Sequence, residues 1–231
     1  MTQTNHVAII LDGNRRFAKR LMLKPWKGHE FGVDKVKKLF DWCAELGIKE
    51  ITLYAFSIDN FQRPKEEFDF IMNLFKDAFE SAKNDPKIHE KKIRINFLGR
   101  LEMMPADIRK KMQELMDATK DYSDYKLNFC MAYGGRAEIT DAAKKIARDV
   151  EDGKLNAKDI TDETMKNYLY SSSEPDLIIR TGGERRLSGF LLYQSNYSEL
   201  FFIEKMWPEF EKEDLEVCLE EFKARERRFG R

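Results

Sequence analysis

The chain has little cysteine and little histidine, three residues of each among 231. Cys43, Cys130 and Cys218 lie far apart, form no CxxC pair and fall within apolar patterns. An odd number of scattered cysteines gives no disulfide framework, and no histidine has a cysteine or another histidine at metal-ligand spacing. These absences disfavour a disulfide-rich domain and a structural zinc site, and they predict buried thiols in a reducing compartment.

The chain also lacks a net charge and a long apolar run. Its 41 basic residues balance 41 acidic residues, whereas a nucleic-acid-binding protein usually has a basic excess. No uninterrupted apolar run approaches the roughly 20 residues of a membrane span. The opening residues MTQTNH do not resemble a signal peptide. We therefore expect a cytoplasmic protein with no nucleic-acid partner and at most a peripheral contact with a membrane.

Three common catalytic or nucleotide-binding motifs are missing as well. The sequence contains no GxxxxGK[ST] loop, no GxGxxG after an apolar strand and no GxSxG elbow. These absences disfavour the usual routes to nucleotide binding and to serine-dependent acyl transfer.

What the sequence does have is an alternation of short apolar runs with longer amphipathic stretches. Its length fits a single domain covering residues 1–231. Such alternation predicts an α/β fold, with a mainly parallel sheet of about six strands flanked by helices. The predicted strands are 7–11, 51–56, 93–98, 127–132 and 177–181, with further apolar segments at 191–193 and 200–203; the predicted helices are 33–46, 65–83, 105–121, 136–150 and 212–227.

Polar clusters follow four of these strands, at residues 12–16, 57–63, 133–136 and 180–186. In open α/β sheets, ligands bind at the carboxyl ends of the strands. The first and last clusters combine glycine with several arginines, as an anion-binding loop requires. We therefore predict that the clusters meet in one pocket that binds two anionic groups.

The first cluster has the parts of a phosphate site. Gly13 allows a close approach of the backbone, and the helix that follows offers free N–H groups. Arg15 and Arg16 supply positive charge, and Asp12 could hold Mg²⁺ between its carboxylate and phosphate oxygens. The alternative for this cluster is an ordinary turn with an aspartate cap, and for the last cluster it is a solvated charged loop.

Taken in order, these motifs resemble the cis-prenyltransferases, the family of undecaprenyl and dehydrodolichyl diphosphate synthases. The resemblance runs from His6 to Gly230. The segments that carry it are HVAIILDGNRRFAKR, the GH pair at 28–29, ITLYAFSIDNFQRP, MAYGGRAEI, DLIIRTGGERRLSGFLLYQSNYSELFF, WP at 207–208 and RERRFGR. The DGNRR form is closer to archaeal and eukaryotic members than to bacterial ones.

The resemblance implies a transferase that condenses isopentenyl diphosphate with an allylic prenyl diphosphate to make a Z-polyprenyl diphosphate, an intermediate for a glycosyl-carrier lipid. It implies Mg²⁺ as the cofactor, bound by Asp12, with Glu199 as a second magnesium carboxylate. It also implies a hydrophobic tunnel for the growing chain. One wall of this tunnel could come from the apolar stripe of the predicted helix 65–83, and the alternative for that stripe is ordinary core packing; its residues are Phe68, Phe70, Ile71, Leu74 and Phe75. The residues that it assigns to the allylic site are Gly13, Asn14, Arg15, Arg16, Phe17 and His29.

The remaining site residues are implied in the same way. Arg180, Arg186 and Ser188 would bind the diphosphate of isopentenyl diphosphate. The condensing carbons would lie near Ser57, Asn60, Phe61 and Arg63, with Asn60 linked to loss of the C2 proton. The tail with Gly230 would reach across the interface of a homodimer.

Two departures from the family pattern keep alternatives open. Pro25 stands where the family often has an arginine, and Val33, Phe68 and Phe70 are bulky for a tunnel wall. A short-chain or atypical enzyme that uses another acceptor is therefore one alternative. A non-catalytic partner subunit of a heterodimer is the other.

Overall fold

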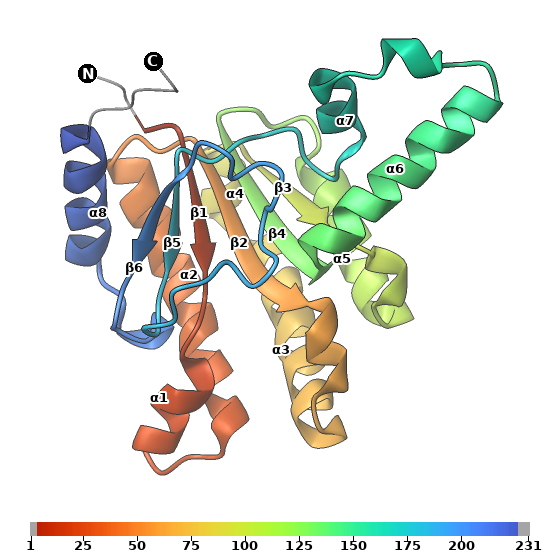
Figure 1. Ribbon diagram of the computed structural model, residues 1–231. Coiled ribbons are helices and arrows are strands. Elements are labelled where there is room, and N and C mark those ends of the chain that lie inside the picture. The colour runs from red at the N-terminus through yellow and green to blue at the C-terminus, as the bar shows by residue number, and fades with distance from the viewer. Residues whose placement is uncertain (1–3, 226–231) are drawn as a thin grey trace.

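The computed structural model describes residues 4–225 and contains a six-stranded sheet in which each pair of neighbours is parallel (Figure 1). The strand order is β3-β4-β2-β1-β5-β6. Their bounds are β1 (His6–Ile10), β2 (Glu50–Ser57), β3 (Ile93–Leu98), β4 (Tyr125–Tyr133), β5 (Leu177–Arg180) and β6 (Glu199–Phe202). The predicted single-domain α/β fold with a six-stranded parallel sheet is confirmed.

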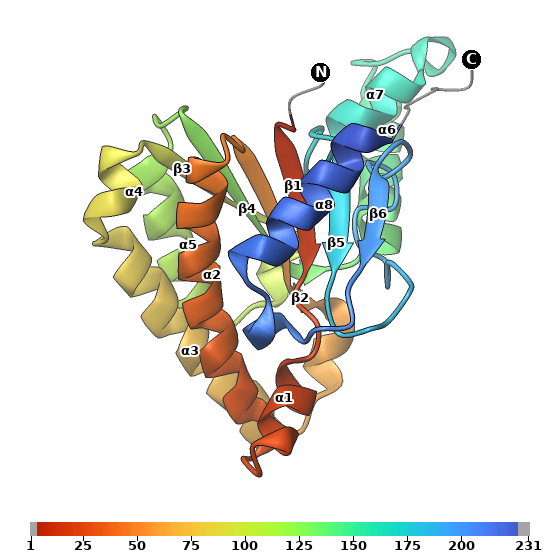
Figure 2. The ribbon, with the colours of Figure 1, turned by 90° about the vertical axis from the view of Figure 1, so that its left-hand side faces the viewer.

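Helices connect the strands and cover both faces of the sheet. The α-helices are α1 (Asn14–Arg20), α2 (Gly28–Glu45), α3 (Lys65–Lys83), α4 (Pro86–Glu90), α5 (Ala106–Thr119), α6 (Gly135–Glu151), α7 (Asp162–Tyr168) and α8 (Lys212–Ala224). Short 3₁₀ turns are η1 (Pro25–Lys27), η2 (Ile58–Gln62), η3 (Leu101–Met103), η4 (Ala157–Asp159) and η5 (Trp207–Glu209). Figure 2 shows α2, α3 and α8 on one side of the sheet, with α6 and α7 beyond the other.

Successive residues of β1 supply two different cores because side chains alternate along a strand. Val7 and Ile9 join the larger cluster beneath α2, α3 and α8, and Ala8 and Ile10 join a smaller cluster on the opposite face. A strand that is buried on both faces reads as a continuous apolar run, which is the pattern in the sequence.

Two parts of the helical pattern were not predicted. The short helices α4 and α7 were missed, although Asp85 and Thr161 cap their first turns with side-chain hydrogen bonds. Helix α2 also begins five residues before the predicted position. Gly28 is the first residue of α2. A Cβ at this position would lie 1.9 Å from the carbonyl oxygen of Asn14, so only glycine permits this close contact between α1 and α2.

Within residues 4–225, no helix is both long enough and apolar enough to cross a membrane.

Candidate active site

The carboxyl ends of β1 and β5 place an aspartate beside a buried arginine. Ile10 and Arg180 are register partners, and Asp12 follows two residues after β1 ends. Arg180, which is only 5% exposed, donates through Nη2 to Asp12 Oδ2 at 2.8 Å. Arg16 Nη2 lies 3.3 Å from Asp12 Oδ1. The first and last polar clusters of the sequence therefore meet at one carboxylate. This meeting was predicted from the strand-end rule, by which ligands bind at the carboxyl ends of the strands in an open α/β sheet.

The backbone of Asp12 is held from two directions. Its carbonyl oxygen accepts hydrogen bonds at 2.8 Å from Trp207 N and from Thr181 Oγ1. Gly13 follows with a φ of 106°, and a Cβ there would lie 2.7 Å from the Cβ of Met206. Only glycine satisfies both constraints, so the turn fixes where the Asp12 carboxylate points.

Arg180 also organises the loop that follows β5. Its Nη1 donates to Ser188 Oγ at 2.8 Å and to the carbonyl oxygen of Arg186. The Arg186 guanidinium is exposed and lies 2.6 Å from Glu184 Oε2. The structure thus brings Ser188 and the backbone of Arg186 to the Arg180 guanidinium, whereas the Arg186 guanidinium is exposed and pairs with Glu184.

A second carboxylate, Glu67, holds three further cationic or polar groups at the same edge of the sheet. Its side chain is 1% exposed, and its Oε1 accepts from Arg63 Nη1 at 2.7 Å. The same oxygen lies 3.5 Å from Arg15 Nε and 3.9 Å from His29 Nε2. The sequence analysis missed Glu67, because an acidic residue in the first turn of a helix is ordinarily a solvent-exposed complement to the helix dipole.

The protonation states of His29 and Glu67 follow from the charges and the burial around these two side chains. Burial lowers the pKa of His29, and the Arg63 charge lowers it further against the opposing effect of Glu67. Arg63 Nη1 donates to His29 Nε2 at 3.1 Å, which requires that nitrogen to be unprotonated. The guanidiniums of Arg63 and Arg15 lower the pKa of the Glu67 carboxyl, and the neutral His29 ring adds no charge to it. The group at neutral pH is therefore a neutral imidazole, an anionic carboxylate and two guanidiniums.

Ser57 and Asn60 fix the turn at the end of β2. Asn60 Oδ1 accepts from Ser57 N at 3.0 Å, and the Ser57 side chain accepts in return from the backbone of Asn60. This reciprocal cap places both side chains on the wall of the main cavity.

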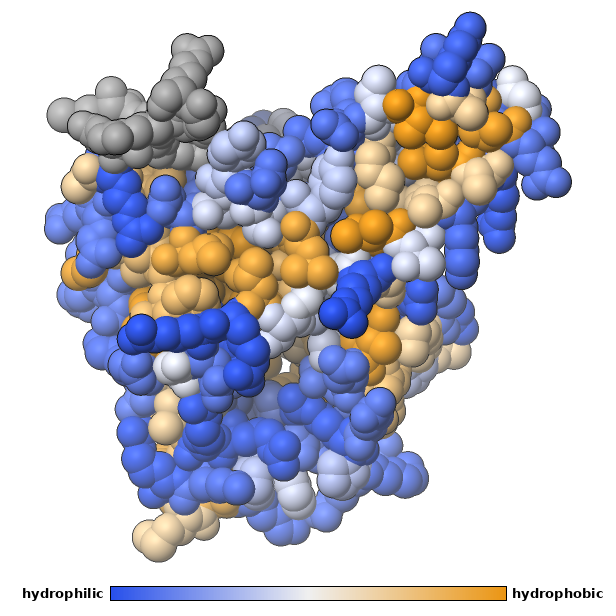
Figure 3. All heavy atoms as spheres, viewed as in Figure 1, coloured by the Kyte–Doolittle hydropathy of each residue, from blue (hydrophilic) through white to orange (hydrophobic). Residues whose placement is uncertain are grey.

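That cavity has a volume of about 560 Å³ and runs from the polar edge into the space between the sheet, α2 and α3. Asp12, Asn14, His29, Ser57, Asn60, Arg63 and Arg180 line its polar end. Farther in, its wall is mainly apolar and includes Val33, Val36, Phe40, Ile51, Phe56, Ile71, Leu74, Phe75, Ala78 and Phe79. The space-filling view in Figure 3 shows a hollow below the centre of the molecule, framed by hydrophilic residues.

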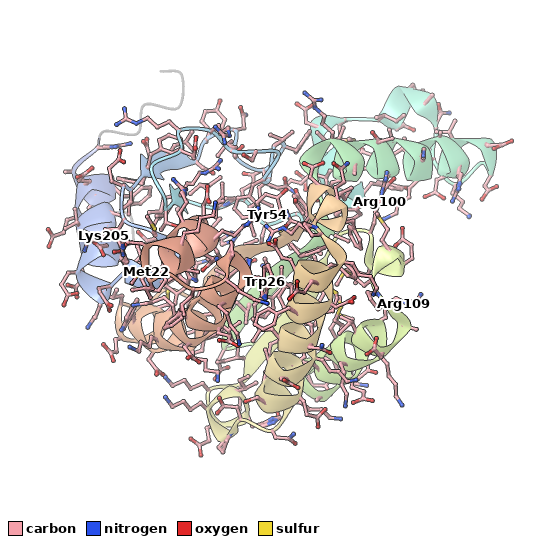
Figure 4. All side chains as sticks on the ribbon, turned by 90° about the horizontal axis from the view of Figure 1, so that it is seen from below. Met22, Trp26, Tyr54, Arg100, Arg109 and Lys205 are labelled. Atoms are coloured by element: carbon pink, nitrogen blue, oxygen red, sulfur yellow. The ribbon has the colours of Figure 1, made fainter. Side chains whose placement is uncertain are left out.

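A smaller pocket of about 310 Å³ adjoins the polar end. Arg15, Arg16, Lys19 and Gly13 line it, and it shares Asp12, Asn14, His29 and Arg63 with the larger cavity. The arrangement can therefore bind an apolar chain in the large cavity and anionic groups at its mouth. In Figure 4, which looks onto this edge of the sheet, Tyr54 lies near the middle of the molecule, and this residue also lines the large cavity.

Some residues that were expected at the tunnel or in the site lie elsewhere. Phe68 packs on Phe56 and Phe61, and the Phe70 ring lies 4.9 Å from Lys27 Nζ, so neither lines the cavity. Phe61 also packs edge-to-face on Phe56. Phe17 packs edge-to-face on Phe31, outside both pockets. Phe61 and Phe68 therefore support the cavity wall from behind, through Phe56. Gly230 lies outside the described residues.

Glu199 does not join Asp12 within one chain. It begins β6 in register with Leu177, three residues before Arg180, whereas Asp12 lies beyond the end of β1. Because the strands are parallel, Glu199 lies towards the amino-end edge of the sheet. Its carboxylate pairs there with Arg225. The sequence could not show this, since the motif that contains Glu199 begins a strand and the other site motifs follow one. A magnesium role for Glu199 stays a prediction.

The residues around Asp12 fit Mg²⁺ that is shared with a phosphate, rather than held in a protein cage. Among residues 4–225 there is no group of three or more carboxylate, histidine or cysteine side chains that could hold a metal ion. Mg²⁺ commonly binds one or two carboxylates together with phosphate oxygens and water. Asn14 Oδ1 and Arg180 Nε are buried at this edge and have no hydrogen-bond partner among the described atoms. A buried polar atom without a partner at a pocket wall indicates a ligand that supplies one.

Known proteins are similar to this chain over nearly its whole length. Residues 10–230 match a family model described as "Putative undecaprenyl diphosphate synthase". The chain is 51% identical over 228 residues to a tritrans,polycis-undecaprenyl-diphosphate synthase (geranylgeranyl-diphosphate specific) from Thermococcus kodakarensis, covering 98% of this chain and 86% of that one. It is 46% identical over 232 residues to an isoprenyl transferase from Thermus thermophilus, with coverages of 98% and 88%.

Solved structures show the same likeness. Lavandulyl diphosphate synthase from Lavandula x intermedia, in complex with dimethylallyl diphosphate, superposes with a TM-score of 0.94 at 34% identity over 99% of both chains. A probable undecaprenyl diphosphate synthase from Campylobacter jejuni gives 0.83 at 32% identity over the full length of both. The matched family model, the identity over nearly the whole length and the shared fold together show that this chain belongs to the undecaprenyl diphosphate synthase family, the cis-prenyltransferases.

Proposed function

We propose that the chain condenses isopentenyl diphosphate with an allylic prenyl diphosphate to make a Z-polyprenyl diphosphate for a glycosyl-carrier lipid. The observation that carries the proposal is the junction of an arginine-rich mouth with a long apolar cavity, at the single carboxylate of Asp12. A substrate with an anionic head and a hydrocarbon tail matches this polarity. The name of the Thermococcus relative supports geranylgeranyl diphosphate as the primer.

The proposed allylic diphosphate occupies the smaller pocket, at the start of α1. Arg15, Arg16 and Lys19 face it, and His29 and Arg63 close its inner wall. When the allylic C–O bond breaks, the diphosphate leaves with the electron pair, and preorganised cationic groups stabilise that charge without moving. Mg²⁺ bound by Asp12 would supply further charge to the leaving diphosphate.

The diphosphate of isopentenyl diphosphate is assigned to Arg180, Arg186 and Ser188. Arg180 is fixed by Asp12 and Ser188, so it can orient the second substrate beside the first. The double bond of isopentenyl diphosphate then forms a bond to the allylic carbon, and the C2 proton leaves. Asn60 lies at the wall where this happens, and we assign it to orient the group that takes the proton, because an amide is not a base at neutral pH.

We also propose that the enzyme is a homodimer located in the cytoplasm. The described part of β6 pairs only with β5, so it is an edge strand of the sheet. Leu192, Tyr197 and Leu200 are exposed on or just before it, and Figure 3 shows apolar side chains gathered over this region. An exposed edge with an apolar face is a common site of self-association. The three buried free cysteines support a reducing compartment.

A product assay on the purified protein tests the proposed activity. It uses Mg²⁺, labelled isopentenyl diphosphate and allylic primers of increasing length, with product length and double-bond geometry read by chromatography. Long Z-products from geranylgeranyl diphosphate would support the proposal. One or two additions, or transfer to another acceptor, would favour an atypical enzyme, and no product with any primer would favour a non-catalytic subunit.

The variant Asp12→Asn tests the role of this carboxylate, because it keeps the size of the side chain and removes its charge. We expect turnover to fall by at least about 100-fold, since the change removes a charge that acts on the reacting diphosphate. The circular dichroism spectrum should stay unchanged. Unaltered turnover in Asp12→Asn would contradict the assignment of this carboxylate.

A further inference from the structure

An apolar tip at the end of α1 is exposed to solvent. The tip consists of Leu21, Met22 and Leu23, whose exposed fractions are 45%, 94% and 41%. Phe31, from the neighbouring turn of α2, is 41% exposed as well. The loop that carries the tip is the lowest part of the molecule in Figures 1 and 2, and Figure 4 shows Met22 and Trp26 on that lower face.

The helix end at the tip holds Met22 in a backbone conformation that side chains disfavour. Leu23 N donates to Ala18 O at 2.9 Å and Met22 N to Lys19 O at 3.0 Å, the two bonds of a Schellman helix end. Met22 occupies the left-handed position of this motif, with a φ of 57°. Glycine usually fills that position because side chains are disfavoured there. The chain instead has a methionine whose side chain is almost wholly exposed, so its apolar surface points to an external apolar partner.

The charges around the tip indicate what that partner is. Residues 13–29 contain six basic residues and no acidic residue. Five of the six basic side chains pair with acidic residues outside this segment, and the pairs nearest the tip are Arg20 with Glu209, Lys24 with Glu66 and Lys27 with Glu30. These three pairs are partly or largely exposed and are therefore weak. Apolar residues and a tryptophan bordered by basic residues are the composition of segments that bind at the surface of an anionic bilayer.

We propose that the apolar tip inserts into the headgroup region of an anionic lipid bilayer, with the basic side chains of Arg20, Lys24 and Lys27, which line neither pocket, facing the lipid phosphates. Trp26 lies half-buried beside the tip, with Lys24 Nζ 5.1 Å from its ring, a position that suits the lipid interface. This insertion needs no bound substrate and no contact with the cavity.

The position of the tip gives the insertion a consequence for turnover, and this consequence rests on the proposed function. Helix α1 has seven residues, so its two ends are roughly 10 Å apart. Arg15 and Arg16 at its start line the smaller pocket, and the tip follows its end. Insertion therefore holds the mouth of the site close to the bilayer, where a prenyl diphosphate with a long tail is dissolved.

The first test measures binding without any substrate. Purified full-length protein is sedimented with vesicles of phosphatidylcholine, with and without about 30% phosphatidylglycerol. We expect the wild-type protein to bind the anionic vesicles and to bind neutral vesicles at least about tenfold more weakly. If wild-type protein stays in the supernatant with anionic vesicles, the proposal is overturned.

Met22→Gly separates loss of binding from loss of folding. Glycine is favoured at this left-handed position, so the urea midpoint of this variant should equal or exceed that of the wild type. Its partition onto anionic vesicles should fall by roughly fivefold or more, because the most exposed apolar side chain is gone. Val217→Ser, at a 52% exposed position on α8, is the matched control and should bind as the wild type does.

Two outcomes would point to another occupant of the tip. Full vesicle binding by Met22→Gly would place the contact elsewhere and overturn the proposal. Light scattering that shows a smaller assembly for Met22→Gly than for the wild type would place the tip against a second copy of the chain, which also overturns it. In the supporting outcome, fluorescence of Met22→Trp shifts to the blue on anionic vesicles and that of Val217→Trp does not.

Discussion

Glu67 contacts three of the polar side chains that the sequence assigned to the site, although it belongs to none of the recognised motifs. Its carboxylate accepts from Arg63 and faces Arg15 and His29 from a fully buried position. A buried carboxylate of this kind holds guanidiniums at fixed positions before any substrate arrives. We therefore treat Glu67 as a positioning residue, which acts through Arg15 and Arg63.

Glu67→Gln should weaken both the site and the fold. The variant keeps an acceptor oxygen but removes the charge that compensates Arg63, so the free energy of unfolding should fall by about 1–3 kcal/mol. The KM for the allylic substrate should rise more than kcat falls, since the substrate-facing arginines lose their fixed positions. Steady-state kinetics and urea unfolding measure the two effects.

Glu66→Gln provides the matched control for this prediction. Glu66 is the preceding residue, and its side chain is 67% exposed and pairs only at the surface with Lys24. Loss of an exposed pair should change stability by at most about 0.5 kcal/mol. If the two variants behave alike, Glu67 does not position the arginines.

Two buried histidines predict a loss of stability on acidification. Burial lowers the pKa values of His6 and His29 below the usual 6.5. The unfolded chain therefore takes up these protons first as the pH falls, so the stability present above pH 6.5 declines as the pH drops towards the folded-state pKa values. The slope is at most about 1.4 kcal/mol per pH unit for each histidine.

Urea unfolding at several pH values between about 7.5 and 5.5 measures this slope. His29→Gln should reduce it while leaving the contribution of His6, whose Nε2 is 2.8 Å from Thr52 Oγ1. A free energy of unfolding that stays constant over this range, or rises on acidification, would contradict the predicted protonation states.

At the scale of elements, the sequence predicted the sheet better than the site. Five strands and five long helices were predicted near their observed positions because each has a clear apolar period. The strand-end rule also brought Asp12, Arg16, Arg180 and Ser57 to one edge. It could not place Glu199, since a residue that begins a strand lies at the opposite edge from one that follows a strand.

The sequence also could not predict which side chains of α3 point into the cavity. The apolar stripe of this helix suggested a tunnel wall with Phe68, Phe70, Ile71, Leu74 and Phe75. Only Ile71, Leu74 and Phe75 line the cavity, and the other two pack on neighbouring rings and a lysine. An amphipathic pattern identifies the buried face of a helix. Residues that line a cavity and residues that pack in a core give the same pattern, so the sequence does not distinguish them.

The part of the cavity wall that α3 contributes should limit the length of the product. Ala78 lines the cavity beside Phe75 and Phe79. Ala78→Leu should fill part of the space that the growing chain occupies and shorten the main product by at least one isoprene unit. Addition to a short primer should proceed at nearly the wild-type rate, since the polar end is unchanged.

Chromatography of the products reads this outcome directly. Asn73→Leu, on the exposed side of the same helix, adds the same side chain outside the cavity and should leave the product distribution unchanged. If Ala78→Leu gives products of wild-type length, the growing chain does not follow this wall.

For the whole molecule, the exposed edge of the sheet makes the proposed homodimer testable. Leu200 is 37% exposed on β6, and the strand has no partner on its outer side among residues 4–225. Leu200→Lys places a charge on this face, and burying it in an interface would be unfavourable. We expect the dimer dissociation constant to rise by at least about tenfold, which corresponds to roughly 1.4 kcal/mol.

Light scattering after size-exclusion chromatography over a range of concentrations measures this change. Val217→Lys, on the exposed side of α8, is the control for an added surface charge and should stay dimeric. The circular dichroism spectra of both variants should match the wild type, because neither side chain belongs to the core.

A wild-type protein that is monomeric at every concentration, or a Leu200→Lys variant as dimeric as Val217→Lys, would contradict association through β6. If the Leu200→Lys monomer also loses activity while binding anionic vesicles as the wild type does, dimerisation completes the catalytic site independently of the lipid contact at the tip of α1.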